Sequence, residues 1–185
     1  MTATRTRADA VRNYERVVSA AAEVLGEKGA EAGVPEIAAR AGVGKGTIYR
    51  CFPTKEHLVS AVIAERLRGF TEAAQRAATQ SDAWEAFVAL LCDAAEHQAT
   101  DCTFAAGLSH ESTLPELVEA RAVLHATLDE LMARAKAQGR MRADVTSQDV
   151  KVLFAGMSQM LRAEDNRDPR EWRRYAGLVA DAMRA

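Results

Sequence analysis

The sequence predicts an all-α protein of about nine helices, with a small N-terminal three-helix module and a larger helical domain. Three observations carry this prediction. Alanine, leucine, glutamate and arginine are abundant and runs of β-branched residues are absent, a composition that favours helices. Apolar residues recur three and four positions apart, as on one face of a helix. Glycine and proline stand between the periodic segments, where helices end and begin.

The N-terminal module is expected to hold three helices. Apolar residues fall on one face over about Asp9–Lys28, and Gly29 follows as a stop, because glycine tolerates the left-handed backbone after a helix. The second helix is short, over Pro35–Ala41, since proline suits a first helical turn. Gly42 ends it. The third helix is expected over Lys45–Cys51.

Three helical segments are expected next. Thr54 is an N-cap candidate for a helix that reaches about Thr79 and spans roughly 39 Å at 1.5 Å per residue. Such a rod can join two lobes of a protein. Ser81 is expected to cap the following helix, which ends near Gln98. A short helical segment is expected over about 101–109.

Three helices close the chain, expected over about 113–138, over about 146–163 and from Asp168 onward. Thr113 and Thr146 are each followed three residues later by an acidic residue, which is the pattern of a capping box. With this order of elements, we place the domain boundary between residues 1–55 and 56–185.

Composition narrows the classes of protein that remain. The 185 residues are 48% hydrophobic and 27% charged, which is typical of a folded globular protein. No apolar run approaches the roughly 20 residues that cross a bilayer, and the N-terminus has no apolar core of a secretory signal. Cys51, Cys92 and Cys102 form no CxxC pair, which fits a reducing compartment. We therefore expect a cytoplasmic protein without a membrane partner.

The segment 41–52, AGVGKGTIYRCF, holds the most specific signal in the chain. With the preceding helix it reads as helix, tight turn, helix. Ile48 and Phe52 lie one turn apart and can anchor the second helix, so its opposite face points outward. A helix-turn-helix places such a face in the major groove of DNA. The residues expected to meet DNA are Lys45, Gly46, Thr47, Tyr49, Arg50 and Lys55.

The residue types suit that task. Gly46 allows the backbone to approach a phosphate or a base edge, and Thr47 and Tyr49 can donate to phosphate oxygens. Arg50 can form a bidentate pair with guanine. Lys55 adds its charge to the dipole at the start of the long helix, where a phosphate is favoured.

Two other interpretations of this segment are weaker. A phosphate-binding P-loop requires a preceding strand and the order GxxxxGK[ST], whereas here a helix precedes the order GxGKGT. A plain packing hairpin would not need unpaired cations at Lys45 and Arg50 beside two glycines.

The same residues resemble the DNA-binding module of the tetracycline-repressor (TetR) family. That family has the core IAxxAGVSxGTLYxHF followed by KExL, and this chain has IAARAGVGKGTIYRCF and then PTKEHL over 37–58. The resemblance covers roughly residues 10–60 and implies that the six residues named above contact DNA. Gly44, Cys51 and Val34 depart from the family pattern, and Gly44 in particular provides no side chain to cap the third helix.

The resemblance also implies that the second domain binds a small-molecule effector and pairs two protomers. The stretch GRMRADVTSQDV, over 139–150, and the C-terminal stretch WRRYAGLVADAMRA resemble SbtR-like regulators. An effector pocket is expected inside the helices of about 69–138. Its candidate lining residues are Phe70, Trp84, Phe87, Leu91, Phe104, Leu108, Leu128 and Met132. His97, His110 and His125 are the polar candidates nearby, and their spacing gives a metal site little support.

The last two helices carry apolar residues on more than one side, which suggests packing both inward and against a partner. With the family resemblance, this predicts a symmetric homodimer through a four-helix interface. The candidate dimer residues are Phe154, Met157, Leu161, Trp172, Tyr175 and Val179.

The most favoured function is therefore a TetR-type repressor, a homodimer that releases a palindromic double-stranded DNA operator when a small molecule binds. An enzyme is disfavoured because the sequence holds no nucleophile-base-orienter set, metal triplet or cofactor fingerprint, so no catalytic residue and no cofactor is expected. A non-sensing architectural DNA binder is disfavoured by the small basic excess of residues 1–66, ten basic against eight acidic residues, because nonspecific binding relies on charge.

Overall fold

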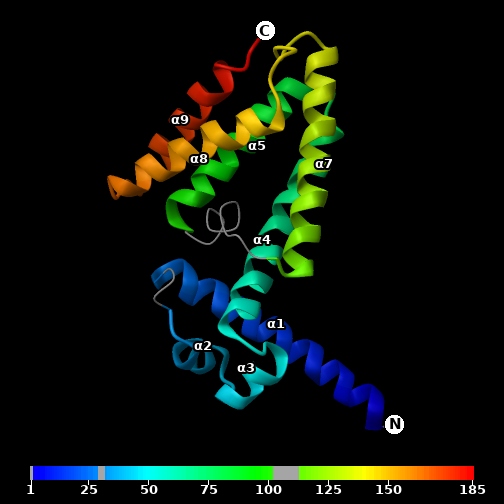
Figure 1. The fold of residues 1–185 in the computed structure, drawn as a ribbon, viewed down its shortest axis with the longest axis vertical. Helices are drawn as coiled ribbons and strands as arrows, with labels where there is room; N and C mark the ends of the chain where they lie inside the picture. The colour runs from blue at the N-terminus through cyan, green and yellow to red at the C-terminus, as the bar shows by residue number, and fades with distance from the viewer. Residues whose placement is uncertain (1, 29–31, 102–112) are drawn as a thin grey trace.

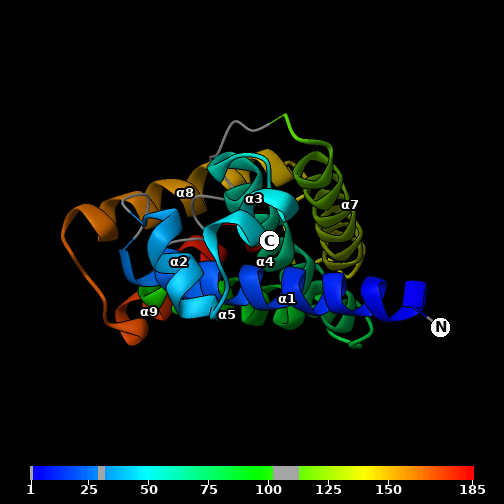
Figure 2. The same cartoon turned by 90° about the horizontal axis from the view of Figure 1, so that it is seen from below.

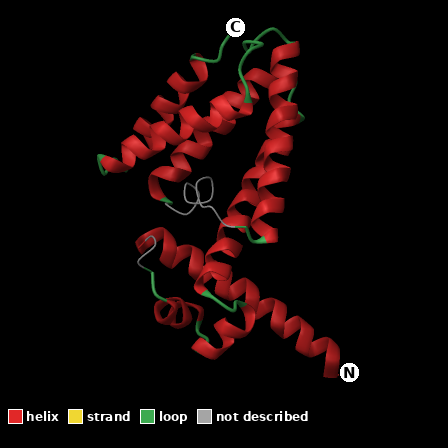
Figure 3. Ribbon diagram, in the orientation of Figure 1, coloured by secondary structure: helices red, strands yellow, loops and turns green. Residues whose placement is uncertain are grey.

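The structure is a computed structural model that describes the backbone of residues 2–28, 32–101 and 113–185, with side chains from Val11 onward in these ranges. The described residues form eight helices and no strand (Figure 3), which confirms the all-α prediction. The helices are α1 (Thr2–Lys28), α2 (Val34–Ala41), α3 (Lys45–Cys51), α4 (Lys55–Ala78), α5 (Ala83–Thr100), α7 (Pro115–Ala137), α8 (Ser147–Ala163) and α9 (Pro169–Asp181). The expected stop at Gly29 and nearly all of the segment 101–109 lie outside the described residues.

The first three helices and the first turns of α4 fold around one core, at the end of the molecule opposite the C-terminus (Figure 1). Ile48 and Phe52 are buried in this core, as the sequence pattern predicts. The ring of Phe52 packs against Tyr14 of α1, with 5.0 Å between the centroids. This packing fixes α3 by its apolar side, so the other side of this short helix faces outward.

The turn before α3 confirms the expected glycine roles. Gly42 ends α2 with φ of +64°, in the left-handed region, where a residue with a Cβ is strained. Gly44 is the N-cap of α3 and gives it no side-chain cap. Pro53 follows α3 and is exposed.

Helix α4 joins the two parts of the molecule. Thr54 caps its first turn by accepting a hydrogen bond from the backbone N–H of His57, as predicted. Leu58 and Val62 near its start are buried in the N-terminal core, whereas Leu67 belongs to the second core. One continuous helix thus has its first turns in one core and its later turns in the other.

The second core lies among α4, α5, α7, α8 and α9. Helix α4 packs along α7 and α5 packs along α9, and α8 and α9 lie side by side at the far end of the molecule (Figure 1). Within the described residues, no helix is both long enough and apolar enough to span a bilayer.

Three helix starts differ from the sequence prediction. Helix α1 begins at Thr2 rather than near Asp9; no glycine or proline interrupts the residues between them. Helix α5 is capped by Asp82 rather than Ser81, since the Asp82 carboxylate accepts from the N–H of Glu85 at 3.0 Å. The backbone oxygen of Ser81 instead accepts from the side chain of Gln138.

The third difference is the start of α7. Leu114 is its N-cap and no side-chain cap forms there, so the capping box expected at Thr113 is wrong. Pro115 explains the shift, because proline is favoured at the first helical position. The capping box expected at Thr146 is confirmed: its hydroxyl accepts from the N–H of Asp149, whose carboxylate accepts from the N–H of Thr146.

Replacing Gly42 by alanine is expected to lower the free energy of unfolding by about 1–2 kcal/mol, the usual penalty for a side chain in the left-handed region. The added Cβ would also lie 3.1 Å from Nη2 of Arg16, which donates to the carbonyl of Ala41 at 2.7 Å. Urea unfolding followed by circular dichroism measures the change.

The matched control is Gly46→Ala in α3, where an added Cβ meets nothing within 4 Å. Its stability should stay unchanged or rise by up to ~1 kcal/mol, because alanine favours helix over glycine. Equal stability of the two variants would contradict a strain at Gly42.

Candidate functional site

The outward side of α3 collects the residues that the sequence predicts to meet DNA. Lys45, Gly46 and Arg50 are exposed and Thr47 is half-buried, while Tyr49 is 51% exposed. Nothing lies within 4 Å of a Cβ placed on Gly46, so the backbone there is open to a close approach. Seen from below, α3 lies on the near side of the molecule (Figure 2).

Arg50 and Thr47 are joined on this surface. Nη2 of Arg50 donates to Oγ1 of Thr47 at 3.1 Å. The bond holds the guanidinium along the helix, and it leaves the threonine O–H free to donate, because the hydroxyl accepts and donates at once. The guanidinium has further N–H groups for an acceptor outside the protein.

Lys55 is the first residue of α4 and is exposed. The backbone N–H groups of a first helical turn point away from the helix and carry its positive dipole end. Thr54 satisfies the N–H of His57, and its Oγ1 lies 2.8 Å from Nδ1 of His57. The charge of Lys55 and the positive end of the α4 dipole thus lie together beside α3.

Other cations of the N-terminal module hold its helices together. Arg40 of α2 pairs with Glu23 and Glu27 of α1, at 2.9 and 3.0 Å. The hydrogen bond from Arg40 holds the pKa of Glu27 below its usual value. Lys28 pairs with Glu36 and likewise lowers the pKa of that carboxyl. These pairs fix α2 on α1, and so position the turn and α3.

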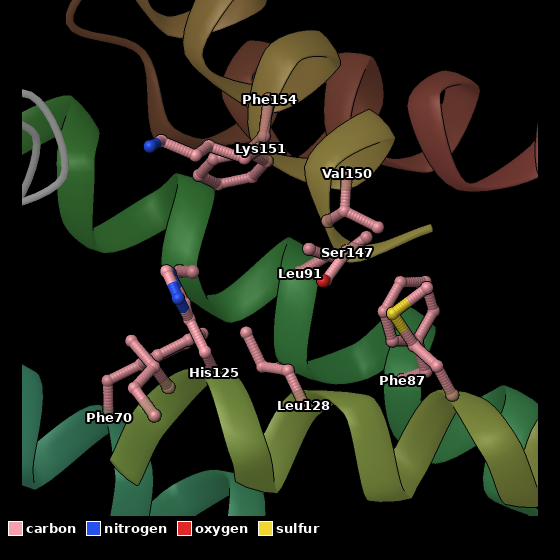
Figure 4. Close-up of a pocket in the computed structure, with 12 residues that line it drawn as sticks. Phe70, Phe87, Leu91, His125, Leu128, Ser147, Val150, Lys151 and Phe154 are labelled. Atoms are coloured by element: carbon pink, nitrogen blue, oxygen red, sulfur yellow. The ribbon is translucent and has the colours of Figure 1, made fainter. Parts of the chain in front are cut away.

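The larger domain contains a cavity between α4, α5, α7 and α8 (Figure 4). Its volume is about 60 Å³, which makes it narrow beside the roughly 300–1,000 Å³ of typical ligand pockets. Nine of the twelve side chains around it are apolar. The lining residues are Phe70, Phe87, Leu91, Ala94, Leu124, His125, Leu128, Met132, Ser147, Val150, Lys151 and Phe154.

Five of the eight predicted pocket residues lie around this cavity: Phe70, Phe87, Leu91, Leu128 and Met132. Trp84 does not line it. Its ring is fully buried and packs against Phe87 and under the guanidinium of Arg184. Phe104 and Leu108 lie outside the described residues. His125 lies at the cavity, whereas His97 does not and His110 is outside the described residues.

Four lining residues come from α8, which the sequence analysis assigned to pairing of protomers. Phe154, expected in the dimer interface, is buried and lines the cavity. Ser147, Val150 and Lys151 stand beside it. The apolar stripe that holds Val150 and Phe154 was visible in the sequence. Periodicity alone does not tell whether such a stripe packs inside its own protomer or against a partner protomer.

The six predicted dimer residues separate into two groups. Phe154, Leu161 and Trp172 are buried within the protomer, so they are unavailable to a partner without repacking. Met157 and Val179 are partly buried and Tyr175 is exposed. The large apolar side chains that α8 and α9 expose are Val152, Leu153, Met160, Tyr175 and Leu178.

The structure gives no support to a metal site in the part of the chain that it describes, where no group of three or more metal-binding side chains comes together. Cys51 is half-buried, as expected, and Cys92 is buried with its thiol pKa raised by burial.

Comparisons with known proteins agree with this arrangement of parts. Residues 17–62 match the profile of a family described as bacterial regulatory proteins, tetR family. Residues 81–185 match the profile described as the C-terminal domain of SbtR-like transcriptional regulators. No curated protein matches the chain.

Solved structures are similar over nearly the whole chain. A TetR transcription regulatory protein from Mycobacterium vanbaalenii is 32% identical, with 97% of this chain and 99% of that one covered and a TM-score of 0.63. A TetR regulator from Streptomyces coelicolor is 28% identical, with coverage of 92% and 98% and a TM-score of 0.66. The FadR regulator from Bacillus subtilis, solved with stearoyl-CoA, is 20% identical and shares the fold, with coverage of 91% and 96% and a TM-score of 0.71.

Proposed function

Because the chain belongs to the TetR family of DNA-binding transcription regulators, we propose that it is a homodimeric repressor that releases a palindromic operator when a small molecule binds its larger domain. The observation that carries the proposal is the outer side of α3. Lys45, Tyr49 and Arg50 project from a helix whose other side is anchored in a core. With the exposed backbone at Gly46, this is the form of a recognition helix.

In this proposal the contacts divide by task. Lys45, Thr47, Tyr49 and Lys55 bind phosphates and so set the position of α3 in the major groove. Arg50 reads a guanine edge. The DNA-binding domain is residues 1–55, completed by the first turns of α4 that enter its core.

A dimer follows from the exposed apolar side chains of α8 and α9. Five of the nine large apolar side chains that are exposed among the described residues lie on these two helices. An exposed apolar surface of this kind marks an interaction site. A twofold dimer would present two copies of α3 to two half-sites, as helix-turn-helix proteins require.

Release of DNA would operate through α4. Phe70 of α4 lines the cavity, and Leu58 of the same helix is buried in the N-terminal core. These residues are about 18 Å apart along the helix axis. A ligand that is bound more tightly when α4 is tilted would move both copies of α3 out of register with the half-sites, and the ratio of affinities for the two states sets the shift.

The test is binding of the full chain to DNA from upstream of its own gene, followed by fluorescence anisotropy at several salt concentrations. Specific binding that falls steeply with salt is expected. Arg50→Ala should relax the preference at one base pair by about 1–3 kcal/mol, and Tyr49→Phe should weaken binding to all sequences alike.

The control for these variants is Arg76→Gln, an exposed cation of α4 about 30 Å along the helix from Lys55. Its DNA binding should equal that of the unmodified protein. An unchanged base preference in Arg50→Ala would refute the proposal that Arg50 recognises a guanine. Failure of the folded protein to bind any duplex at low salt would refute the function.

A further inference from the structure

The cavity in the larger domain has an uneven distribution of polar groups. Its three polar lining side chains are His125, Ser147 and Lys151, and no aspartate or glutamate lines it among the described residues. In the close-up, the ammonium of Lys151 and the ring of His125 lie toward the end of the cavity that holds Phe70 (Figure 4). Phe87 lies toward the opposite end.

Lys151 differs from most basic residues of this protein. Cations such as Arg40, Arg140 and Arg173 pair with carboxylates, and the ammonium of Lys136 donates to a backbone carbonyl. The structure gives Lys151 no hydrogen bond or ion pair with any described residue, and its neighbours one turn away on α8 include no acid. The ring of His125 likewise has no hydrogen bond within the described part of the chain. Both side chains are exposed, so two hydrated donors lie at one end of an apolar cavity with no acceptor from the described protein.

The size of the cavity restricts the body of a ligand. A cavity of about 60 Å³ favours a slender chain over a ring, since a cavity that holds benzene measures about 150 Å³. The body must be apolar, because Phe87, Leu128 and Phe154 offer it no hydrogen bond and a buried polar group without a partner is unfavourable.

The charge restricts the head group. A carboxylate placed near Lys151 gains a charge-assisted hydrogen bond, the stronger kind of hydrogen bond. An ammonium group there would meet a like charge and find no carboxylate among the described lining residues. An alcohol could accept a hydrogen bond from the ammonium but has no negative charge to pair with it, so it gains less than a carboxylate.

We propose that the cavity binds a small molecule with a slender apolar body and one carboxylate, with the carboxylate paired to Lys151 and the body extending toward Phe87. His125 provides a second donor at the same end, whereas Ser147 lies toward Phe87 (Figure 4). This inference rests on the proposed function, since it names the chemical class of the effector that the repressor would sense.

The experiment is isothermal titration calorimetry of the full chain with three probes of equal length: octanoate, 1-octanol and octylammonium. Octanoate is expected to bind about tenfold more tightly than 1-octanol, in line with one partly exposed charge-assisted hydrogen bond, and octylammonium to bind most weakly. Lys151→Gln should abolish the preference for the acid over the alcohol, and Lys151→Arg should keep it.

Two controls place the binding in the cavity. Arg76→Gln also removes one cation, from a residue that does not line the cavity, and should leave the order of the three probes unchanged. Leu128→Trp fills the cavity and should weaken octanoate and 1-octanol together. Circular dichroism checks the fold of each variant, and Lys151→Gln alone tests the head group if Leu128→Trp does not fold.

The proposal is overturned if octanoate and 1-octanol bind equally, if Lys151→Gln keeps the preference, or if the unmodified protein shows no octanoate binding. None of these results bears on operator binding, which is measured separately by anisotropy without ligand. A protein that binds its operator but ignores octanoate would keep the proposed function and lose this inference. A protein that prefers octanoate but binds no DNA would lose the proposed function and keep the assignment of the cavity to a carboxylate ligand.

Discussion

Replacing Met160 and Leu178 together by glutamate is expected to turn the proposed dimer into a folded monomer and to weaken operator binding by roughly 30-fold or more. Met160 of α8 is 61% exposed and Leu178 of α9 is 52% exposed, so neither side chain supports the core of its own protomer. In the proposed interface each glutamate would lose its hydration against apolar surface of the partner, which strongly disfavours association.

The size of the effect on DNA binding follows from the need for two half-sites. Specific binding typically exceeds nonspecific binding by about 4–10 kcal/mol, and a monomer keeps the base contacts of only one recognition helix. Loss of half of that difference corresponds to roughly 30-fold to several thousand-fold in affinity. Sedimentation velocity measures the mass, and fluorescence anisotropy measures operator affinity on the same samples.

The matched control is Val118→Glu. This residue of α7 is apolar and 50% exposed but lies outside α8 and α9, so the variant should stay a dimer with normal operator affinity. A double variant that remains a dimer would show that α8 and α9 are not the interface. A monomer with undiminished operator affinity would show that pairing is not needed for DNA binding.

The region around α3 could be predicted well from sequence because its signals are local. Gly42 and Pro53 end α2 and α3, and Ile48 with Phe52 identifies the buried side. Each of these signals acts through the backbone or through one helical turn. The same sequence therefore predicted the bounds of α3 and its exposed side together.

The larger domain was predicted less well because its helices carry apolar residues on several sides. On α8, one stripe holds Phe154 and Leu161, which are buried, and another holds Val152 and Met160, which are exposed. Periodicity reveals both stripes but does not tell which one faces the protomer core. That choice depends on where α5 and α9 lie, which is a matter of tertiary packing.

The cavity was missed in part for the same reason. Its predicted residues came from α4, α5, α7 and the segment 101–109, whereas Lys151 and Phe154 reach it from α8. Trp84 was expected there among the candidate residues of 69–138. It is instead held by Arg184, a residue a hundred positions further along the chain, whose guanidinium lies 5.4 Å from the ring centroid. No local pattern predicts such a contact.

Replacing Trp172 by alanine is expected to lower the free energy of unfolding by about 3–5 kcal/mol, as is usual when a large buried aromatic side chain is truncated. The side chain is fully buried. Its Nε1–H donates to the carbonyl of Asn166 at 2.9 Å, and the guanidinium of Arg162 lies 5.3 Å from the ring centroid. The variant would lose packing, a hydrogen bond and a cation–π contact at once.

This variant also distinguishes two roles for Trp172, as an interface residue or as a core residue. The sequence predicts Trp172 in the dimer interface, whereas the structure buries it within the protomer. A core residue should lower stability at every protein concentration. An interface residue should act mainly by promoting dissociation, so its effect should fade as protomer concentration rises. Urea unfolding at two concentrations separates the roles. Leu178→Ala on the exposed side of the same helix is the control, and it should show the concentration-dependent behaviour that Trp172→Ala lacks.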